Sequence, residues 1–227
     1  MAPCQHEWLP SRVAARASRL VSPPPSRTTA TTSPRSTAWR TPTPRAVGPS
    51  TSAVGLVADR RPATPDFTIR PARLDDWPRI WPIVEDVVTE ARTLPYDPGM
   101  GADDARRMWL LPAPARTVVA ADGDRVLGTA NMYANRPGPG SHVASGSLMV
   151  ARAARGAGVG RALTTDLIGW ARENGFAAVQ FNAVVDTNTS AVRLYESLGF
   201  VTLGVAPGAF RHPEHGDVGL RIMWLDL

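Results

Sequence analysis

Apolar positions recur along residues 67–225 with the spacings of helices and strands, whereas the first 64 residues show neither period. Spacings of three and four residues predict helices, and short alternating or continuous apolar runs predict strands. The pattern predicts helices over 76–88, 103–111, 158–174 and 189–198, and strands over 67–70, 117–121, 126–133, 142–150, 178–184, 201–205 and 218–225. This order, β-α-α-β-β-β-α-β-α-β-β, indicates a mixed α/β sheet with helices on both faces.

Turn residues mark several ends of these elements. Asp122-Gly123-Asp124 predicts a hairpin turn between two strands. Gly175-Phe176 and Gly199-Phe200 each predict a helix end followed by a hydrophobic contact. Asp75 or Asp76 is expected to cap the first helix, and Pro82 is expected to kink it.

Residues 1–64 differ from the rest of the chain in composition and charge. They are rich in Pro, Ser, Thr, Ala and Arg and hold nine arginines against two acids, whereas residues 65–227 hold sixteen arginines against eighteen acids. We therefore expect a disordered tail over 1–64 and a folded domain over 65–227. Three interpretations of the tail are open: a polyanion-binding arm, an organelle transit peptide, or a non-functional stretch translated from a start codon placed too far upstream. We favour the last.

Composition excludes several chemistries. The chain has no lysine, which rules out a phosphate loop of the GK[ST] type and any Schiff-base lysine. Cys4 is the only cysteine, so we expect neither a disulfide framework nor a cysteine nucleophile in the domain. No apolar run is long enough for a membrane span. We expect a cytoplasmic protein without a membrane partner and, since the domain is nearly neutral, without a nucleic-acid partner for that domain.

The most informative stretch is Val150–Gly160, where a strand end turns into a glycine-rich helix start. Closely spaced glycines let backbone N–H groups approach an anion, and the helix dipole favours a phosphate there. A dinucleotide-binding loop is a poor alternative, because the last position of that motif falls on Arg161 where Gly or Ala is needed. The stretch therefore predicts a phosphate or pyrophosphate site.

Two motifs in this part of the chain resemble those of the GNAT (Gcn5-related N-acetyltransferase) superfamily. The first is the pyrophosphate loop, with Arg155, Gly158 and Gly160 at its motif positions. The second, Asn-x-x-Ala-x-x-Leu-Tyr-x-x-x-Gly-Phe, is present as Asn188, Ala191, Leu194, Tyr195, Gly199 and Phe200. The resemblance covers residues 67–225 and implies the GNAT fold, a mixed and mostly antiparallel sheet with a splayed parallel strand pair that holds acetyl-CoA.

The resemblance also implies cofactor contacts. Backbone groups of Leu148, Met149 and Val150 would pair with the pantetheine arm. The pyrophosphate would lie at the helix start formed by Arg155, Gly156, Ala157, Gly158, Val159, Gly160 and Arg161. Asn188 would bind the pantetheine, and it can also serve as a plain helix N-cap.

Tyr195 is the candidate catalytic residue. A neutral phenol can protonate the thiolate that leaves when an amine attacks a thioester, although position 195 also fits a core tyrosine. The general base stays unassigned between His142 and Glu90, and Asn182 is a candidate substrate-binding residue. A metal site at His212 and His215, with Glu214 nearby, is disfavoured. The tryptophans are expected to be mostly core and surface residues. The family's use of its first two helices leaves Trp77, Trp81 and Trp109 as an alternative lining of the acceptor pocket.

The function predicted from these motifs is acetyl transfer from acetyl-CoA to the amine of a small molecule, such as an amino acid or an antibiotic-like amine. Direct transfer in a ternary complex is expected, because the domain has no cysteine to carry the acetyl group. One alternative is a peptide acetyltransferase that uses acids near the acceptor side, namely Glu85, Asp86, Glu90, Asp97, Asp103 and Asp104. Another is a non-catalytic acyl-CoA sensor whose basic tail binds nucleic acid. A homodimer is the family expectation.

Overall fold

The computed structural model describes residues 66–227, so the prediction of a disordered tail over 1–64 lies outside the described residues. No helix in the described part is long and apolar enough to cross a membrane. The predicted order of strands and α-helices is confirmed, with short 3-10 turns between some of them. The elements are β1 (Thr68–Pro71), α1 (Trp77–Glu90), α2 (Ala102–Trp109), β2 (Arg116–Asp122), β3 (Arg125–Ala134), β4 (Val143–Val150), α3 (Val159–Glu173), β5 (Ala178–Val185), α4 (Thr189–Ser197), β6 (Val201–His212) and β7 (Gly216–Asp226).

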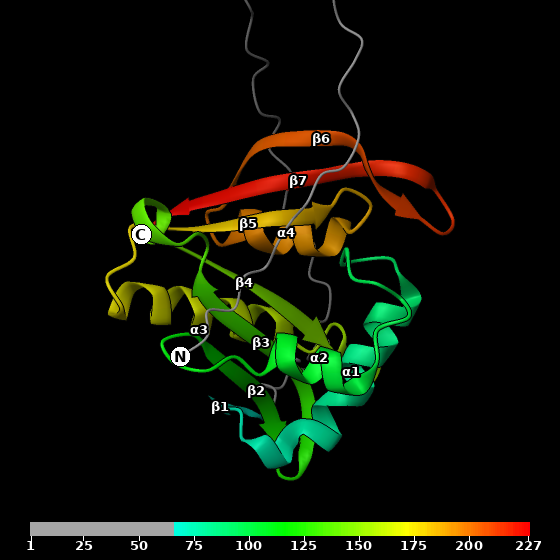
Figure 1. Ribbon diagram of the computed structural model, residues 1–227, viewed down its shortest axis with the longest axis vertical. Helices are drawn as coiled ribbons and strands as arrows, with labels where there is room; N and C mark the ends of the chain where they lie inside the picture. The colour runs from blue at the N-terminus through cyan, green and yellow to red at the C-terminus, as the bar shows by residue number, and fades with distance from the viewer. Residues whose placement is uncertain (1–65) are drawn as a thin grey trace, which may run out of the picture. The chain divides into compact units, whose positions relative to one another are not determined.

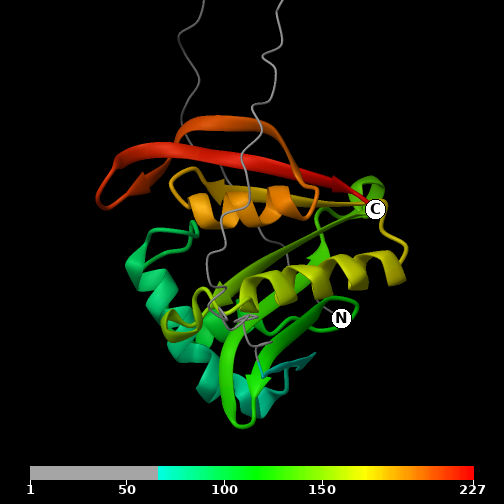
Figure 2. The ribbon, with the colours of Figure 1, turned by 180° about the vertical axis from the view of Figure 1, so that it is seen from behind.

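The strands form one mixed sheet, as predicted, in the order β1-β2-β3-β4-β5-β7-β6 (Figure 1). Every neighbouring pair is antiparallel except β4 and β5, which are parallel. Alternating side chains of β2 reach opposite faces: Val119 packs in the cluster with α1 and α2, and Val118 packs in the cluster with α3. Seen from behind in Figure 2, α3 and α4 cover the face opposite to α1 and α2.

The parallel pair β4–β5 splits soon after it begins. Its pairing holds only Val143 opposite Ala178 and Ala144 opposite Val179. Beyond that point the pairing of β5 with β7 shifts between Phe181 and Val184. A shift of this kind is a bulge, and a bulge bends its strand. The bend leads β5 away from β4 and leaves a gap between them.

Backbone polar groups of β4 point into this gap. The β3–β4 pair begins with Asn135 N donating to Val143 O at 2.7 Å and ends with Ala151 N donating to Leu127 O at 2.9 Å. Because hydrogen bonding alternates along an antiparallel strand, the odd-numbered residues of β4 bond to β3. The N–H and C=O groups of Gly146, Leu148 and Val150 therefore face the side from which β5 has diverged.

The last hairpin is longer than the alternating pattern predicts. The predicted strands end at Val205 and begin again at Val218, whereas β6 runs to His212 and β7 starts at Gly216. Pro207 and Gly208 lie beyond the predicted end of the strand, and the structure accommodates them in a register shift between Ala206 and Phe210. This works because β6 is an edge strand, where a proline does not remove a hydrogen bond that the sheet needs.

Asp76 does not cap α1 with its side chain. Its carboxylate instead accepts two hydrogen bonds from the Arg70 guanidinium, at 2.6 and 2.8 Å, and one from Arg73 N at 2.8 Å. These bonds, led by those from Arg70, lower the pKa of Asp76. The carboxylate thus joins β1 to the turn before α1, and α1 continues through Pro82 as one helix.

Gly146 marks the tightest backbone approach in β4. A Cβ atom there would lie 2.4 Å from the Asn131 carbonyl oxygen and 2.5 Å from Leu167 Cδ1. We expect Gly146→Ala to lower the free energy of unfolding by about 1–3 kcal/mol, as overpacked cores do. Gly169→Ala is the matched control, because nothing lies within 4 Å of its added Cβ and it sits inside α3. Urea unfolding should show Gly169→Ala stabilised by about 0.5–1 kcal/mol, and equal stability of Gly146→Ala and wild type would contradict the prediction.

Candidate functional site

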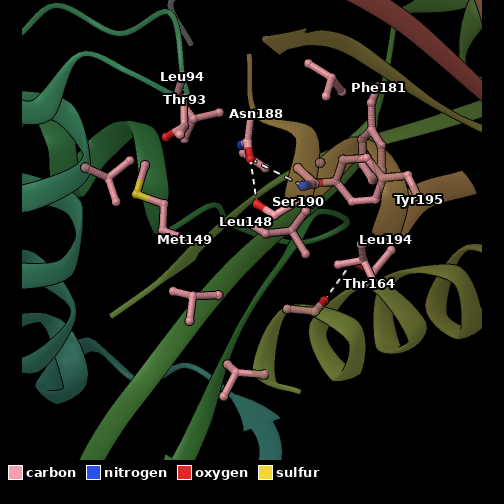
Figure 3. Close-up of a pocket in the computed structure, with 18 of the residues that line it drawn as sticks. Thr93, Leu94, Leu148, Met149, Thr164, Phe181, Asn188, Ser190, Leu194 and Tyr195 are labelled. Carbon is pink, nitrogen blue, oxygen red and sulfur yellow. Dashed lines mark hydrogen bonds between the residues drawn. The ribbon is translucent and has the colours of Figure 1, made fainter. Parts of the chain in front are cut away.

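A cavity of about 760 Å³ occupies the gap between β4 and β5. Its walls come from β4, the glycine loop before α3, the bent part of β5, the start of α4, and residues 93–96 between α1 and α2. Figure 3 shows Thr93 and Leu94 on one side of the cavity and Asn188, Ser190 and Tyr195 on the other. Segments far apart in the sequence thus share one site.

The glycine loop adopts a conformation that suits an anion. Gly156 and Gly158 have φ angles of 81° and 82°, in the left-handed region that favours glycine. Gly158 is the N-cap of α3, so the N–H groups at the start of this helix have no acceptor one turn earlier within it. The candidate cofactor residues of this loop line the cavity with one exception, Ala157, whose N–H donates to Ala154 O at 3.3 Å.

Two arginines bring positive charge to this end of the cavity. Arg155 forms an ion pair with Glu90 at 3.3 Å, and Arg152 contacts the same carboxylate. Arg161 donates to Ser197 Oγ at 2.7 Å and so links α3 to α4. Both Arg155 and Arg161 lie on the cavity wall. Together with the helix start, they make this end of the cavity suited to a phosphate group.

Asn188 is both a helix cap and a cavity residue. Its Oδ1 accepts hydrogen bonds from Ala191 N at 3.3 Å and from Ser190 Oγ at 3.0 Å. These bonds confirm the predicted N-cap of α4. Since the cap uses only the oxygen, the amide nitrogen remains as a donor for a ligand in the cavity.

The position of Tyr195 is compatible with both interpretations from the sequence, a core tyrosine and a proton donor. Its ring packs against Phe181 and Phe200, with centroid distances of 4.6 and 5.8 Å. The residue is nevertheless only half-buried and lines the cavity. Burial raises the pKa of its phenol well above the usual value. The hydroxyl therefore keeps its proton at neutral pH and can donate it.

Asn182 lies at the bulge of β5, on the cavity wall. Its amide donates to Asn135 Oδ1 at 2.7 Å and accepts from Gln180 Nε2 at 2.7 Å. A longer contact of 3.4 Å reaches Ser145 Oγ. The side chain thus connects β5 to the end of β3 and to β4, and it forms the polar floor where the two strands part.

Cavity residues that the sequence interpretation missed include Tyr96, Tyr133, Ser145 and Ser147. The Tyr96 hydroxyl and Ser147 Oγ lie 3.1 Å apart, within hydrogen-bond distance. Burial raises the pKa of the Tyr96 phenol. Ser145 and Ser147 alternate along a strand whose other residues are apolar or glycine, and this pattern could have indicated a polar surface on one face of β4. Tyr96 carries no such signal, since it lies in a loop.

The structure removes both candidate bases from the cavity wall. His142 is exposed just before β4, at the closed end of the gap, and its Nδ1 lies 3.0 Å from Pro139 O. Glu90 ends α1 and is engaged by Arg152 and Arg155. Neither residue is among those that line the cavity.

The structure places the three tryptophans in the core, as the first interpretation has it, and contradicts the pocket alternative. Trp77 and Trp109 are buried in the cluster between α1, α2 and the sheet, and Trp81 packs against that cluster. Trp109 Nε1 donates to Thr129 Oγ1 at 2.9 Å, which satisfies the one polar group of the indole inside the core. Their apolar area stabilises the helix layer instead of lining the cavity.

His212 and His215 take part in the turn of the β6–β7 hairpin. His212 Nδ1 accepts from the backbone N–H groups of Glu214 and His215, at 3.1 and 3.3 Å. The rings of His212 and His215 stack with centroids 4.5 Å apart. Within residues 66–227 no cluster of three His, Cys, Asp or Glu side chains could hold a metal ion.

We expect Glu90→Gln to retain at least about a third of the wild-type kcat, with the acidic limb of its pH–rate profile unchanged. The reason is that Glu90 pairs with two arginines off the cavity wall and so has no position from which to take a proton from an acceptor. Steady-state rates between pH 6 and 9 test this. If the variant lacked the acidic limb of the profile, Glu90 would again be a candidate for the general base.

Comparisons with known proteins agree with this geometry. Residues 77–200 match the model of the acetyltransferase (GNAT) family. A GCN5-related N-acetyltransferase from Kribbella flavida is 54% identical, with a TM-score of 0.70 over 71% of this chain and 98% of that one. A phosphinothricin acetyltransferase from Sinorhizobium meliloti, solved with acetyl-CoA, is 26% identical, with a TM-score of 0.63 over 71% and 89% of the two chains. N-acetyltransferase aca1 of Schizosaccharomyces pombe is 33% identical over 46% of this chain, and the match spans half of aca1.

Proposed function

This chain belongs to the acetyltransferase (GNAT) family, and we propose on that premise that it transfers the acetyl group of acetyl-CoA to the amine of a small molecule. The domain proposed to do so is residues 65–227, without a contribution from residues 1–64. Transfer is direct, in a ternary complex of enzyme, acetyl-CoA and acceptor. A cysteine that could carry the acetyl group does not occur in this domain.

The cofactor half of the cavity has the groups that acetyl-CoA needs. The left-handed Gly156 and Gly158 open the helix start to a pyrophosphate, and no atom lies within 4 Å of where a Cβ of Gly156 would be. Arg155 and Arg161 supply charge, and the backbone groups of Leu148 and Val150 supply an unpaired strand edge for the pantetheine amides. The backbone of Met149, also predicted to pair with the pantetheine, faces β3 instead. Asn188 adds its amide nitrogen. Acetyl-CoA, when bound there, supplies an activated thioester.

Tyr195 is the proposed general acid. It comes from α4, the helix that begins at Asn188, so its hydroxyl and the proposed pantetheine donor belong to one rigid element. The raised pKa keeps the phenol protonated, as an acid that must protonate a departing thiolate requires. Asn182 is proposed to shape the floor under the acceptor through its bonds to Asn135 and Gln180.

The observation that carries the small-molecule proposal is the covering of the acceptor half of the cavity. Residues 93–96 lie on its wall, and Tyr96 is held against β4 by Ser147. Next to them, Arg92 forms an ion pair at 2.5 Å with Glu214, which lies in the turn of the β6–β7 hairpin. We propose that a segment held at both places favours a compact acceptor over an extended peptide. The acids once considered for peptide binding are not on this wall.

The test is a thiol-release assay on the full chain with acetyl-CoA and a panel of amino acids, phosphinothricin, polyamines, aminoglycosides and short peptides. Amine-dependent release of coenzyme A with a small molecule supports the proposal. A preference for peptides that grows with peptide length would overturn the acceptor class. Binding of acetyl-CoA in calorimetry without release on any acceptor would favour an acyl-CoA sensor.

A further inference from the structure

We infer that the hydroxyls of Tyr96 and Ser147 together bind the acceptor nitrogen and select a primary amine. This inference rests on the proposed function and names the acceptor subsite within the same cavity. The pair is formed by residues 51 positions apart, one from the segment after α1 and one from β4, with their oxygens 3.1 Å apart. Both residues line the cavity.

Ser147 is placed where an acceptor has to meet the cofactor. It immediately precedes Leu148, whose backbone groups are proposed to pair with the pantetheine arm. Its own N–H is held by Asn131 Oδ1 at 3.0 Å, and the neighbouring Gly146 admits no side chain. The serine backbone is therefore fixed from both sides, and its hydroxyl projects from a rigid strand.

Tyr96 is placed to act with this serine. Its ring lies in the segment that covers the acceptor half of the cavity, and that segment is anchored beyond it by the Arg92–Glu214 ion pair. Burial raises the pKa of the phenol, so the oxygen is a neutral hydroxyl across the physiological range. A neutral hydroxyl can accept one hydrogen bond while it donates another.

The hydrogen-bonding capacity of the pair matches a primary amine. Each hydroxyl has one proton and two lone pairs, and the bond between them uses one proton and one lone pair. Oxygen lone pairs on both residues remain available as acceptors. A primary amine in its free-base form can donate one N–H to each oxygen and still direct its own lone pair at a carbonyl carbon. A secondary amine has one N–H and leaves one hydroxyl without that bond, which costs affinity.

The experiment uses the full chain as wild type, Tyr96→Phe, Ser147→Ala and the double variant. Steady-state kinetics are measured with glycine, methionine, phosphinothricin and putrescine, each beside its N-methyl derivative, and acetyl-CoA binding is measured by calorimetry. Each single variant should raise the acceptor KM about 3- to 10-fold, the range of one lost hydrogen bond. kcat should change less than about 3-fold, and the Kd of acetyl-CoA less than about 2-fold. Ser141→Ala, at an exposed position off the cavity wall, is the control.

Two further results distinguish this role from a structural one. The wild-type preference for a primary amine over its N-methyl derivative should shrink toward equality in both single variants. The double variant should raise KM by less than the product of the single effects, because the two hydroxyls act as one acceptor. An unchanged KM and an unchanged preference in an active Tyr96→Phe protein would overturn the inference alone. A wild type that acetylates no amine would overturn the proposed function and the inference with it.

Discussion

Tyr195→Phe is expected to lower kcat by about 10²- to 10³-fold, the usual contribution of a general acid. The ring of the variant keeps its packing against Phe181 and Phe200, so only the proton donor is lost. The Kd of acetyl-CoA should therefore stay within about 2-fold of wild type, and the melting temperature should be unchanged. A variant with more than a third of the wild-type kcat would remove Tyr195 from the reaction.

The pH dependence follows from the direction of the pKa shift. Burial raises the pKa of Tyr195 above its usual value near 10, so the phenol loses its proton only at a higher pH than a free tyrosine does. In wild-type protein we therefore expect no decline of kcat between pH 7 and 9.5 from this group. A decline in that range, absent from Tyr195→Phe when each profile is normalised to its maximum, would contradict the raised pKa.

Gly158→Val is expected to raise the Kd of acetyl-CoA by about 10- to 100-fold, which corresponds to about 1.4–2.8 kcal/mol. The φ angle of 82° at Gly158 is one that a β-branched residue rarely adopts, so the variant must distort the start of α3. That helix start provides the N–H groups proposed to hold the pyrophosphate. The variant should therefore lose cofactor affinity while the sheet stays folded.

Gly160→Ala is the matched control for this prediction. Gly160 lies two residues further on and inside the helix, and its added Cβ would meet Leu194 Cδ2 at 3.5 Å, an ordinary contact. The alanine keeps its N–H group, so the Kd of acetyl-CoA should stay within about 3-fold of wild type. Calorimetry on both variants, with circular dichroism to verify folding, checks the pair. Equal affinity of Gly158→Val and wild type would exclude this helix start as the anion site.

The cofactor half of the site could be predicted from the sequence because its determinants are local. The left-handed glycines, the helix start at Gly158 and the N-cap at Asn188 each depend on neighbours within a few residues, and such features leave motifs. Tyr195 could be placed beside Asn188 for the same reason, since it lies on the helix that Asn188 begins. The order of elements could be predicted because periodicity reports burial one element at a time.

The acceptor half could not be predicted, because it depends on contacts between distant segments. The contacts of Tyr96 with Ser147 and of Arg92 with Glu214 join residues 51 and 122 positions apart. The pocket alternative for the tryptophans could not be excluded from the sequence, because an indole has the same apolar pattern whether it faces a core or a pocket. Their packing in the cluster under α1 and α2 separates the two. The extent of β6 was missed because a strand continues through Pro207 and Gly208 only at the edge of a sheet, and the edge position of β6 depends on how distant strands pair.

The early divergence of β5 from β4 also bears on how such an enzyme changes over generations. Where the two strands part, the exposed edge of β4 consists of main-chain groups, which every residue other than proline carries alike. Substitutions at position 147 can therefore change the side chain beside the acceptor while that edge is preserved. Acceptor specificity could therefore change during evolution while the proposed cofactor-binding edge stays the same.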